Sequence, residues 1–214
     1  MLNLLFSGQY ALFGLIVIAL IISLTVHEFG HAAVAYLFGD DTAQRAGRLT
    51  LNPAAHLDPI GLLMVIMVGF GFAKPVPTDS RNFRSRWAEL AVSAAGPGMN
   101  LLLAVLAINA YVLALDLGYL TGPGERQFFL YLTLINLVLM LFNLIPLGAL
   151  DGHYILPYFL SRRMARSYVE FNARYGNMVL MGLILLSMVG IPVFSYVMRV
   201  GQWMMPWIIL VPSA

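Results

Sequence analysis

The chain contains no cysteine and very little charge. Without cysteine, disulfide bonds and thiolate metal ligands are excluded, so a bound metal must use histidine, carboxylate or backbone ligands. Only 10% of the 214 residues are charged, whereas a soluble domain carries about 25%. Hydrophobic residues make up 60% of the chain, and the mean hydropathy is +0.83. We therefore expect the surface to face a lipid bilayer rather than water.

The few basic residues are distributed unevenly along the chain. None precedes the first apolar segment, and the two basic loops follow the first and third apolar segments: Arg45, Arg48, Lys74, Arg81, Arg84 and Arg86, then Arg162, Arg163, Arg166 and Arg174. The positive-inside rule places both loops in the cytoplasm and the N-terminus outside. We interpret these residues as topology determinants and headgroup contacts, and expect no nucleic-acid partner. The first segment also lacks a cleavage site, so we expect a retained span rather than a signal peptide.

Apolar segments predict an all-α polytopic membrane protein. Residues 10–38, 87–117 and 127–145 are long enough to cross a bilayer, and the whole length allows about four to six transmembrane helices. The apolar run 62–72 is too short to span and predicts a re-entrant or β-hairpin-like segment after the first helix. We expect one membrane-embedded domain, 1–214, with a core at 10–160 and C-terminal helices at 161–214.

The first long segment contains the sequence HEFGH, with His27, Glu28 and His31. Residues four apart share one face of a helix, so the two imidazoles can bind one metal ion. Glu28 is well placed to accept a proton from an attacking water. Ionisable residues are costly in an apolar segment, which favours a function over two merely hydrogen-bonded histidines.

A second polar cluster follows the third long segment, in NLIPLGALDG, residues 143–152. Pro146 is expected to break the helix near Asn143. Asp151 needs a partner in so apolar a run, and a metal ion would supply one. Charge asymmetry places both HEFGH and Asp151 toward the cytoplasmic side, so three candidate ligands are expected at the same depth.

With these two motifs, the chain resembles the site-2 protease family of intramembrane zinc metalloproteases. GRLTLNPAAHLDPIG, FAKPVP and AAGPGMN also resemble family segments, and the likeness covers residues 21–152. We interpret AAGPGMN as a site of close helix packing rather than of chemistry. The resemblance implies a compact member with no PDZ or other appended domain.

The resemblance also implies roles for particular residues. His27, His31 and Asp151 would bind one Zn²⁺ per chain, Glu28 would be the catalytic acid/base, and Asn143 would bind substrate or the oxyanion. Hydrogen-bonding, structural or substrate-binding roles near the site are expected for His56, Asn52 and His153.

The predicted function is hydrolysis of peptide bonds within or next to transmembrane segments, near the cytoplasmic face, in regulated intramembrane proteolysis. The predicted partners are a transmembrane protein substrate and the lipid bilayer, and the oligomeric state stays open. We expect residues 62–77 to receive a locally unwound substrate. Two alternatives remain: a metal transporter, against which the lack of an internal repeat counts, and a non-catalytic scaffold that keeps a zinc ion. Glu28 counts against the scaffold, because a structural site needs no base.

Overall fold

The computed structural model describes residues 1–68 and 71–211, and within these ranges the chain is helical, with no strand. In chain order the elements are α1 (Leu2–Phe6), α2 (Tyr10–Leu37), α3 (Thr42–Arg45), α4 (Pro53–His56), α5 (Pro59–Val68), η1 (Ser80–Asn82), α6 (Ala88–Asp116), α7 (Pro123–Asn143), α8 (Asp151–Ile155), η2 (Leu156–Phe159), α9 (Arg162–Phe171), η3 (Asn172–Gly176), α10 (Asn177–Met188), α11 (Val193–Met204) and η4 (Met205–Ile208). The all-helical prediction is confirmed.

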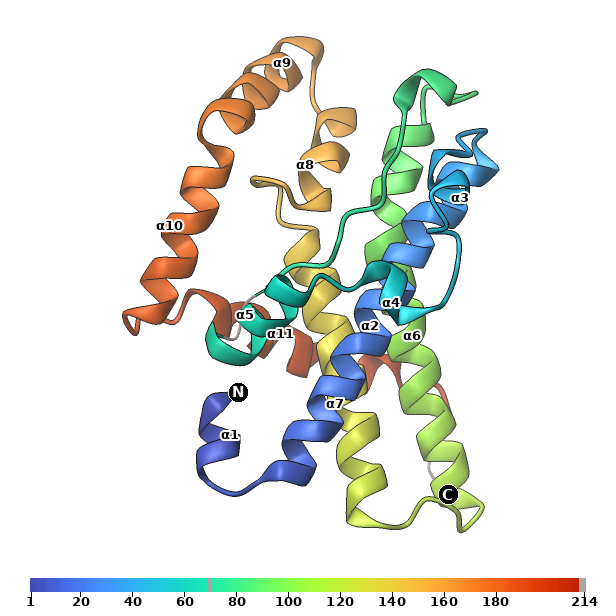
Figure 1. Ribbon diagram of the computed structural model, residues 1–214, viewed down its shortest axis with the longest axis vertical. Coiled ribbons are helices and arrows are strands. Elements are labelled where there is room, and N and C mark those ends of the chain that lie inside the picture. Colours follow the sequence, from blue (N-terminus) through green and yellow to red (C-terminus); the bar gives the residue numbers. More distant parts are fainter. Residues whose placement is uncertain (69–70, 212–214) are drawn as a thin grey trace.

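Three helices form the centre of the molecule. The long helices α2, α6 and α7 pack against one another (Figure 1). Within the described residues these three are long and apolar enough to cross a membrane, with mean hydropathies of 2.3, 2.0 and 1.4. They coincide with the three long segments expected from the sequence. The sequence predicts four to six spans, whereas three helices of the described residues have the length and hydropathy of a span. The C-terminal helices α10 and α11 have 12 residues each, which is fewer than a straight span requires.

Small side chains allow the long helices to approach closely. A Cβ added at Gly30 on α2 would lie 2.6 Å from the Cγ of Met99 and 2.9 Å from the carbonyl oxygen of Ala95, both on α6. Ala19 of α2 is completely buried, in a cluster with Ala107 of α6 and Leu132 of α7. Small residues at helix contacts are typical of membrane proteins, where dispersion and close packing replace hydrophobic exclusion from water.

Large apolar side chains lie on the outside of the same helices. Leu102, Leu106 and Leu113 of α6 are 48%, 57% and 50% exposed. On a soluble protein such a continuous apolar surface would be an aggregation site. On this one it is the surface that the hydrocarbon of a bilayer covers.

The segment after the first span is the element that differs most from prediction. The short apolar run is the helix α5 and not a hairpin of strands, and residues 71–79 then follow without helix or strand, as a long extended stretch in Figure 1. The N–H of Lys74 donates to the carbonyl of His56, 2.8 Å away. Within the described residues the β-hairpin alternative is therefore wrong, because the extended chain lies beside α4 with no second strand to pair with. Part of the predicted run, residues 69–70, lies outside the described residues.

The C-terminal part begins with α9 and α10. These two helices stand apart from the three long helices in Figure 1 and are joined by η3, a π-helical turn. The chain then returns to the bundle, where α11 packs against α7. The side chains of Met204, Met205 and Ile208 pack against a cluster formed by Ala104, Leu137 and Met140.

Candidate metal centre

Helix α2 presents two imidazoles on one face, one turn apart. The Nε2 atoms of His27 and His31 lie 3.0 Å from each other. Both side chains are largely shielded from solvent, with exposed fractions of 7% and 11%. This is the arrangement that residues i and i+4 of a helix produce when both point into a protein interior.

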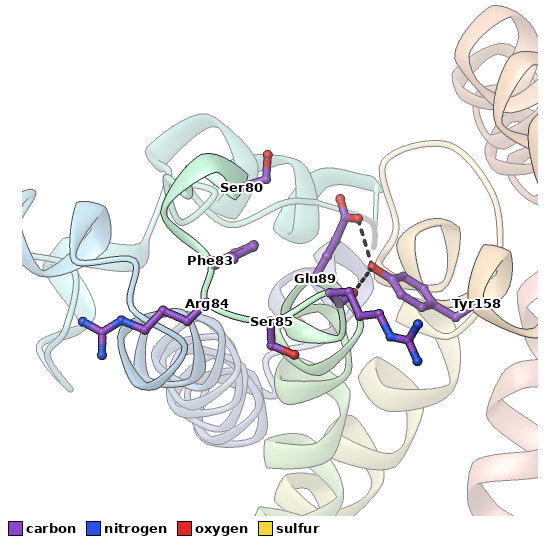
Figure 2. Close-up of a pocket in the computed structure, with 7 residues that line it drawn as sticks. Ser80, Phe83, Arg84, Ser85, Glu89 and Tyr158 are labelled. Atoms are coloured by element: carbon purple, nitrogen blue, oxygen red, sulfur yellow. Dashed lines mark hydrogen bonds between the residues drawn. The ribbon is translucent and has the colours of Figure 1, made fainter.

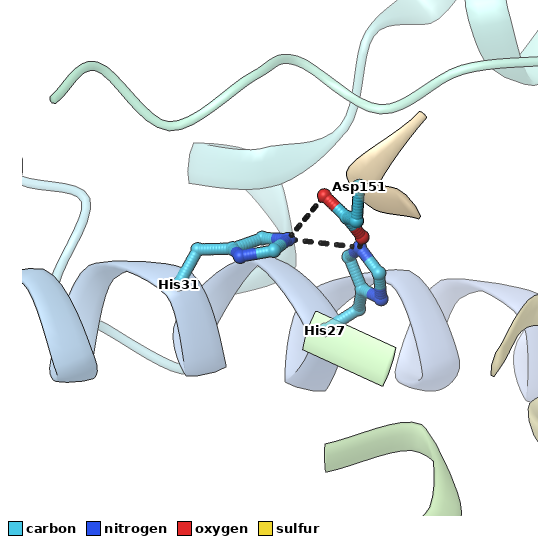
Figure 3. Close-up of side chains that lie close together, drawn as sticks. All are labelled: His27, His31 and Asp151. Carbon is cyan, nitrogen blue, oxygen red and sulfur yellow. Dashed lines mark hydrogen bonds and ion pairs between the residues drawn. The ribbon is translucent and has the colours of Figure 1, made fainter. Parts of the chain in front are cut away.

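Asp151 completes the cluster from a distant part of the sequence. Its Oδ2 lies 3.3 Å from the Nε2 of His27, and its Oδ1 lies 3.4 Å from the Nε2 of His31. The three side chains converge on one point (Figure 3). Helix α7 ends at Asn143 and α8 begins at Asp151, so the break that Pro146 predicts turns the chain and directs the carboxylate back to α2.

Hydrogen bonds determine which ring nitrogens of the histidines carry protons. The Nδ1 of His31 lies 2.7 Å from the carbonyl oxygen of Val92, and the Nδ1 of His27 lies 2.6 Å from the Oδ1 of Asn100. A carbonyl oxygen can only accept, so each Nδ1 must donate. In the neutral rings both Nε2 atoms then present lone pairs toward Asp151.

A buried polar network determines the orientation of Asn100. Its Nδ2 donates to the carbonyl of Ser23, at 3.2 Å, and to the Oδ1 of Asn136, at 2.8 Å. The Nδ2 of Asn136 donates in turn to the Ser23 hydroxyl and to the Leu132 carbonyl, both at 2.8 Å. Ser23, Asn100 and Asn136 are completely buried. Because every donor in this network has an acceptor, the oxygen of Asn100 must face His27.

The donor set fits a zinc ion. Two imidazole lone pairs 3.0 Å apart repel each other, and the buried Oδ2 of Asp151 has no hydrogen-bond donor. A cation among them removes both defects. Zinc binds nitrogen and oxygen ligands at about 2.0–2.2 Å, so neighbouring ligands of a tetrahedral ion are about 3.4 Å apart. The three separations of 3.0, 3.3 and 3.4 Å are close to that value.

Gly96 of α6 makes room for the two imidazoles. A Cβ at this position would lie 2.6 Å from the Nε2 of His27 and closer still to the Nε2 of His31. No side chain larger than a hydrogen atom fits there without moving the rings. Gly96 therefore has the packing role predicted for AAGPGMN. Asn100 of the same motif has a different role, because it accepts a hydrogen bond from His27.

Glu28 lies beside the cluster and is 8% exposed. Its carboxylate interacts electrostatically with His31 and with the guanidinium of Arg48. Arg48 is itself buried, and it donates to the carbonyl oxygens of Pro75, at 3.0 Å, and Lys74, at 2.5 Å. Arg48 thus attaches the extended segment 71–79 to the part of the molecule that contains Glu28.

The short helix η2, which follows α8, is held against the start of α6 by Tyr158. The hydroxyl of Tyr158 lies 3.2 Å from the carbonyl oxygen of Arg86 and 3.3 Å from the Oε2 of Glu89, in a pocket of about 380 Å³ (Figure 2). Burial, together with the neighbouring Glu89 carboxylate, raises the pKa of Tyr158 above its ordinary value. Tyr158 is therefore a neutral hydrogen-bond donor, and its hydroxyl links η2 to the start of α6.

The remaining residues named from the sequence lie outside the three-residue cluster. Asn143 donates from its Nδ2 to the carbonyl of Leu139 on its own helix, at 2.9 Å. His56 is completely buried, with its Nε2 2.7 Å from the Thr50 carbonyl oxygen, which fits a structural role. Asn52 caps α4 by accepting from the N–H of Ala54. His153 lies 3.2 Å from the hydroxyl of Tyr168. Their functional roles stay predictions.

Three long apolar helices and a buried cluster of two histidines, an aspartate and an adjacent glutamate define a membrane-embedded metallopeptidase. The family model described as peptidase family M50 matches residues 15–118 and 118–187. The chain belongs to this family of zinc metalloproteases, the site-2 protease family, as the sequence motifs predicted.

Curated relatives agree with this assignment. Over 146 residues the chain is 48% identical to "Putative zinc metalloprotease YwhC" of Bacillus subtilis, covering 66% of this chain and 67% of that protein. It is 34% identical to "Putative zinc metalloprotease Rip2" of Mycolicibacterium smegmatis and 33% identical to that of Mycobacterium tuberculosis H37Rv. Each match covers 66% of this chain and 55% of the mycobacterial protein. No solved structure matches the chain.

Proposed function

We propose that this protein is an intramembrane endopeptidase that cleaves membrane proteins within or next to their transmembrane segments. The observation that supports this most strongly is the convergence of His27, His31 and Asp151, with Glu28 beside them, inside a bundle of apolar helices. His27 is ten residues before the end of α2 at Leu37. At 1.5 Å per residue that places it about 15 Å from the helix end, below the level of the headgroups.

His27, His31 and Asp151 would hold one Zn²⁺ per chain. When bound, zinc supplies Lewis acidity, which lowers the pKa of water toward ~7 and polarises a carbonyl group. A set of three histidine or carboxylate ligands is typical of catalytic rather than structural zinc sites. The protonated Nδ1 atoms of both histidines orient the rings, and Asn100 and Val92 hold them in that orientation.

Glu28 is the proposed proton carrier. It accepts a proton from the attacking water and delivers one to the departing amine. Its neighbour Arg48 keeps positive charge close to the Glu28 carboxylate. Asn143, at the end of α7, is the proposed group that contacts the substrate carbonyl or the oxyanion.

The extended segment 71–79 is the proposed substrate-docking edge. A transmembrane helix hides its peptide groups in hydrogen bonds, so it must unwind locally before attack. Extended chain offers backbone groups to an unwound partner. In Figure 3 an extended stretch of chain passes over the three clustered side chains, and the bonds from Arg48 hold this segment beside the part that contains Glu28. We propose that the site opens toward the cytoplasm, because the flanking loops contain the basic residues.

The test is coexpression with candidate single-span membrane proteins. Wild type is expected to produce a cut that a zinc chelator prevents. Glu28→Gln keeps the size of the side chain and should keep zinc, but it removes the proton carrier and is expected to lower cleavage at least about 10²-fold. Cleavage at an undiminished rate by Glu28→Gln would refute the mechanism. Retained metal transport or scaffolding without any cleavage by wild type would favour the alternative classes.

A further inference from the structure

The connection from α7 to α8 determines where Asp151 lies, yet it has little structure of its own. Residues 144–150 contain Pro146, which has no N–H, and Gly148 in the left-handed region at φ +62°. Two backbone hydrogen bonds have both ends within this connection, from the N–H of Leu147 to the carbonyl of Ile145 at 2.9 Å and from the N–H of Leu150 to the carbonyl of Leu147 at 3.3 Å. A metal ligand must be held to within about 0.5 Å. Contacts from elsewhere in the chain must therefore supply this rigidity.

Asn172 supplies two of these contacts. The N–H of Gly148 donates to the Oδ1 of Asn172, at 2.8 Å, and the Nδ2 of Asn172 donates to the carbonyl of Gly148, at 2.9 Å. Asn172 is 6% exposed. One buried amide thus satisfies both backbone groups of the residue three positions before Asp151, in the paired manner of two residues in an antiparallel sheet.

Tyr168, one helical turn before Asn172, makes a second attachment. Its hydroxyl donates to the carbonyl of Pro146, at 3.0 Å. The Nδ1 of His153, two residues after Asp151, lies 3.2 Å from the same hydroxyl. Because that hydroxyl gives its one proton to Pro146, His153 must donate to it. Tyr168 therefore contacts the chain on both sides of Asp151.

The local backbone is shaped for this contact. Asn172 begins the π-helical turn η3, and such turns occur frequently at functional sites. At the other end of the turn, a Cβ on Gly176 would collide with the Asn172 side chain and lie 3.0 Å from the Gly148 nitrogen. A Cβ on Gly148 would lie 2.9 Å from the Oδ1 of Asn177. Two glycines thus let the η3–α10 segment lie close to the α7–α8 connection.

We propose that Asn172 is a positioning residue for the metal ligand Asp151, and that through it the α9–α10 helices control how well the third ligand reaches the two histidines. This inference rests on the proposed metal-binding function. Helices α9 and α10 stand apart from the α2–α6–α7 bundle in Figure 1. A displacement of this pair would therefore pull on the Asp151 connection through the amide of Asn172, without any change in His27 or His31.

The test measures metal binding of the full chain in detergent. Asn172→Ala is expected to raise the zinc dissociation constant, measured by competition with a chelator, about 10- to 100-fold. With cobalt alone as the probe, its visible absorption should change in shape, because the carboxylate geometry has changed. Asn172→Asp keeps the volume and the acceptor for Gly148 N–H but turns an oxygen toward the Gly148 carbonyl, so it should weaken zinc binding too. If Asn172→Ala does not fold, the zinc affinity of Asn172→Asp tests the proposal instead.

The matched control is Asn109→Ala. Asn109 of α6 also holds a distant segment through its amide: it donates to the Ile208 carbonyl at 2.7 Å and accepts from the N–H of Leu210 at 2.6 Å and of Val211 at 3.0 Å. Its loss should lower thermal stability but leave zinc affinity and the cobalt spectrum unchanged. The proposal is overturned if the folded Asn172 variants bind both metals like wild type, or if Asn109→Ala weakens zinc equally. A wild type that binds no zinc would instead refute the proposed function.

Discussion

The Nδ1 of His27 lies 2.6 Å from the Oδ1 of Asn100, and this one hydrogen bond determines the tautomer of the first histidine of the metal centre. The bond joins α2 to α6 across 73 positions of sequence. Because the amide nitrogen of Asn100 is occupied by Ser23 and Asn136, its oxygen can only face the imidazole. A network without any charged group thus directs the Nε2 lone pair of His27 toward the metal position.

Replacing Asn100 by alanine is expected to weaken zinc binding about 10- to 100-fold, because the imidazole loses the acceptor that orients it. Chelator competition on the purified protein measures this. Thr133→Val is the control: Thr133 is also completely buried, but its hydroxyl donates to its own helix, to Phe129 at 2.8 Å. Equal zinc affinities for Asn100→Ala and wild type would show that zinc binding does not depend on the hydrogen bond between His27 and Asn100.

Adding one methyl group at Gly96 should disrupt the metal centre. In Gly96→Ala the new Cβ would lie 2.6 Å from the Nε2 of His27, so the rings must move apart. We expect zinc affinity to fall at least about 10-fold, together with peptidase activity. Gly98→Ala, two residues along the same helix, meets nothing within 4 Å and should behave like wild type. A functional Gly96→Ala protein would contradict the geometry of the α2–α6 contact.

Removing the Arg48 guanidinium should weaken substrate docking but leave metal binding unchanged. Arg48→Leu loses both bonds to the carbonyls of Lys74 and Pro75, so the extended segment loses this attachment. Cleavage of a membrane substrate should fall at least about 10-fold, while zinc affinity stays within about 2-fold of wild type. Arg48→Lys keeps the positive charge but lacks the two guanidinium N–H groups that donate to the two carbonyls, so it should recover only part of the activity. Full activity in Arg48→Leu would show that this attachment is not needed for docking.

The pH dependence of stability should reveal a second polar cluster at the end of α2. Burial disfavours the charged form of Asp40, but donors from Thr42, Asn82 and the Asp79 N–H outweigh it and lower its pKa below the ordinary 3.8. With the folded pKa depressed, this stabilisation is complete above the ordinary pKa and is lost as the pH falls through the folded value.

Asp40→Asn in the zinc-free protein should therefore lower the free energy of unfolding by about 1–3 kcal/mol at pH 7. Thermal melting in detergent between pH 7 and about pH 3 checks this, and the difference from wild type should narrow toward the acid end. A difference that stays constant with pH would show that the carboxylate charge is not the stabilising element.

The parts of this structure that depend on local sequence could be predicted, and those that depend on tertiary contacts could not. The three long helices follow from hydropathy and length, and the pairing of His27 with His31 follows from helical periodicity. Asp151 was found because an aspartate is costly in an apolar run. The same reasoning, applied to uncharged polar residues, would have identified Asn100 and Asn136 as candidates, but their partners depend on how the helices are rotated about their axes.

The contacts that hold the extended segment and the C-terminal helices could not be predicted from the sequence. Proline and glycine indicated irregular chain around residues 62–77 but could not show that Arg48, 26 positions before Lys74, holds it. Likewise no local pattern distinguishes Asn172 from any other helical asparagine. Its proposed role follows from its hydrogen bonds to Gly148, a residue 24 positions away in the α7–α8 connection.

The central claim is that His27, His31 and Asp151 together hold one zinc ion, and the metal content of purified protein tests it most directly. Wild type and Glu28→Gln should each contain one zinc per chain by elemental analysis. Asp151→Ala should lose zinc to a chelator that wild type resists, while it still folds and inserts into the membrane. An Asp151→Ala protein that keeps one equivalent of zinc as tightly as wild type would contradict the account.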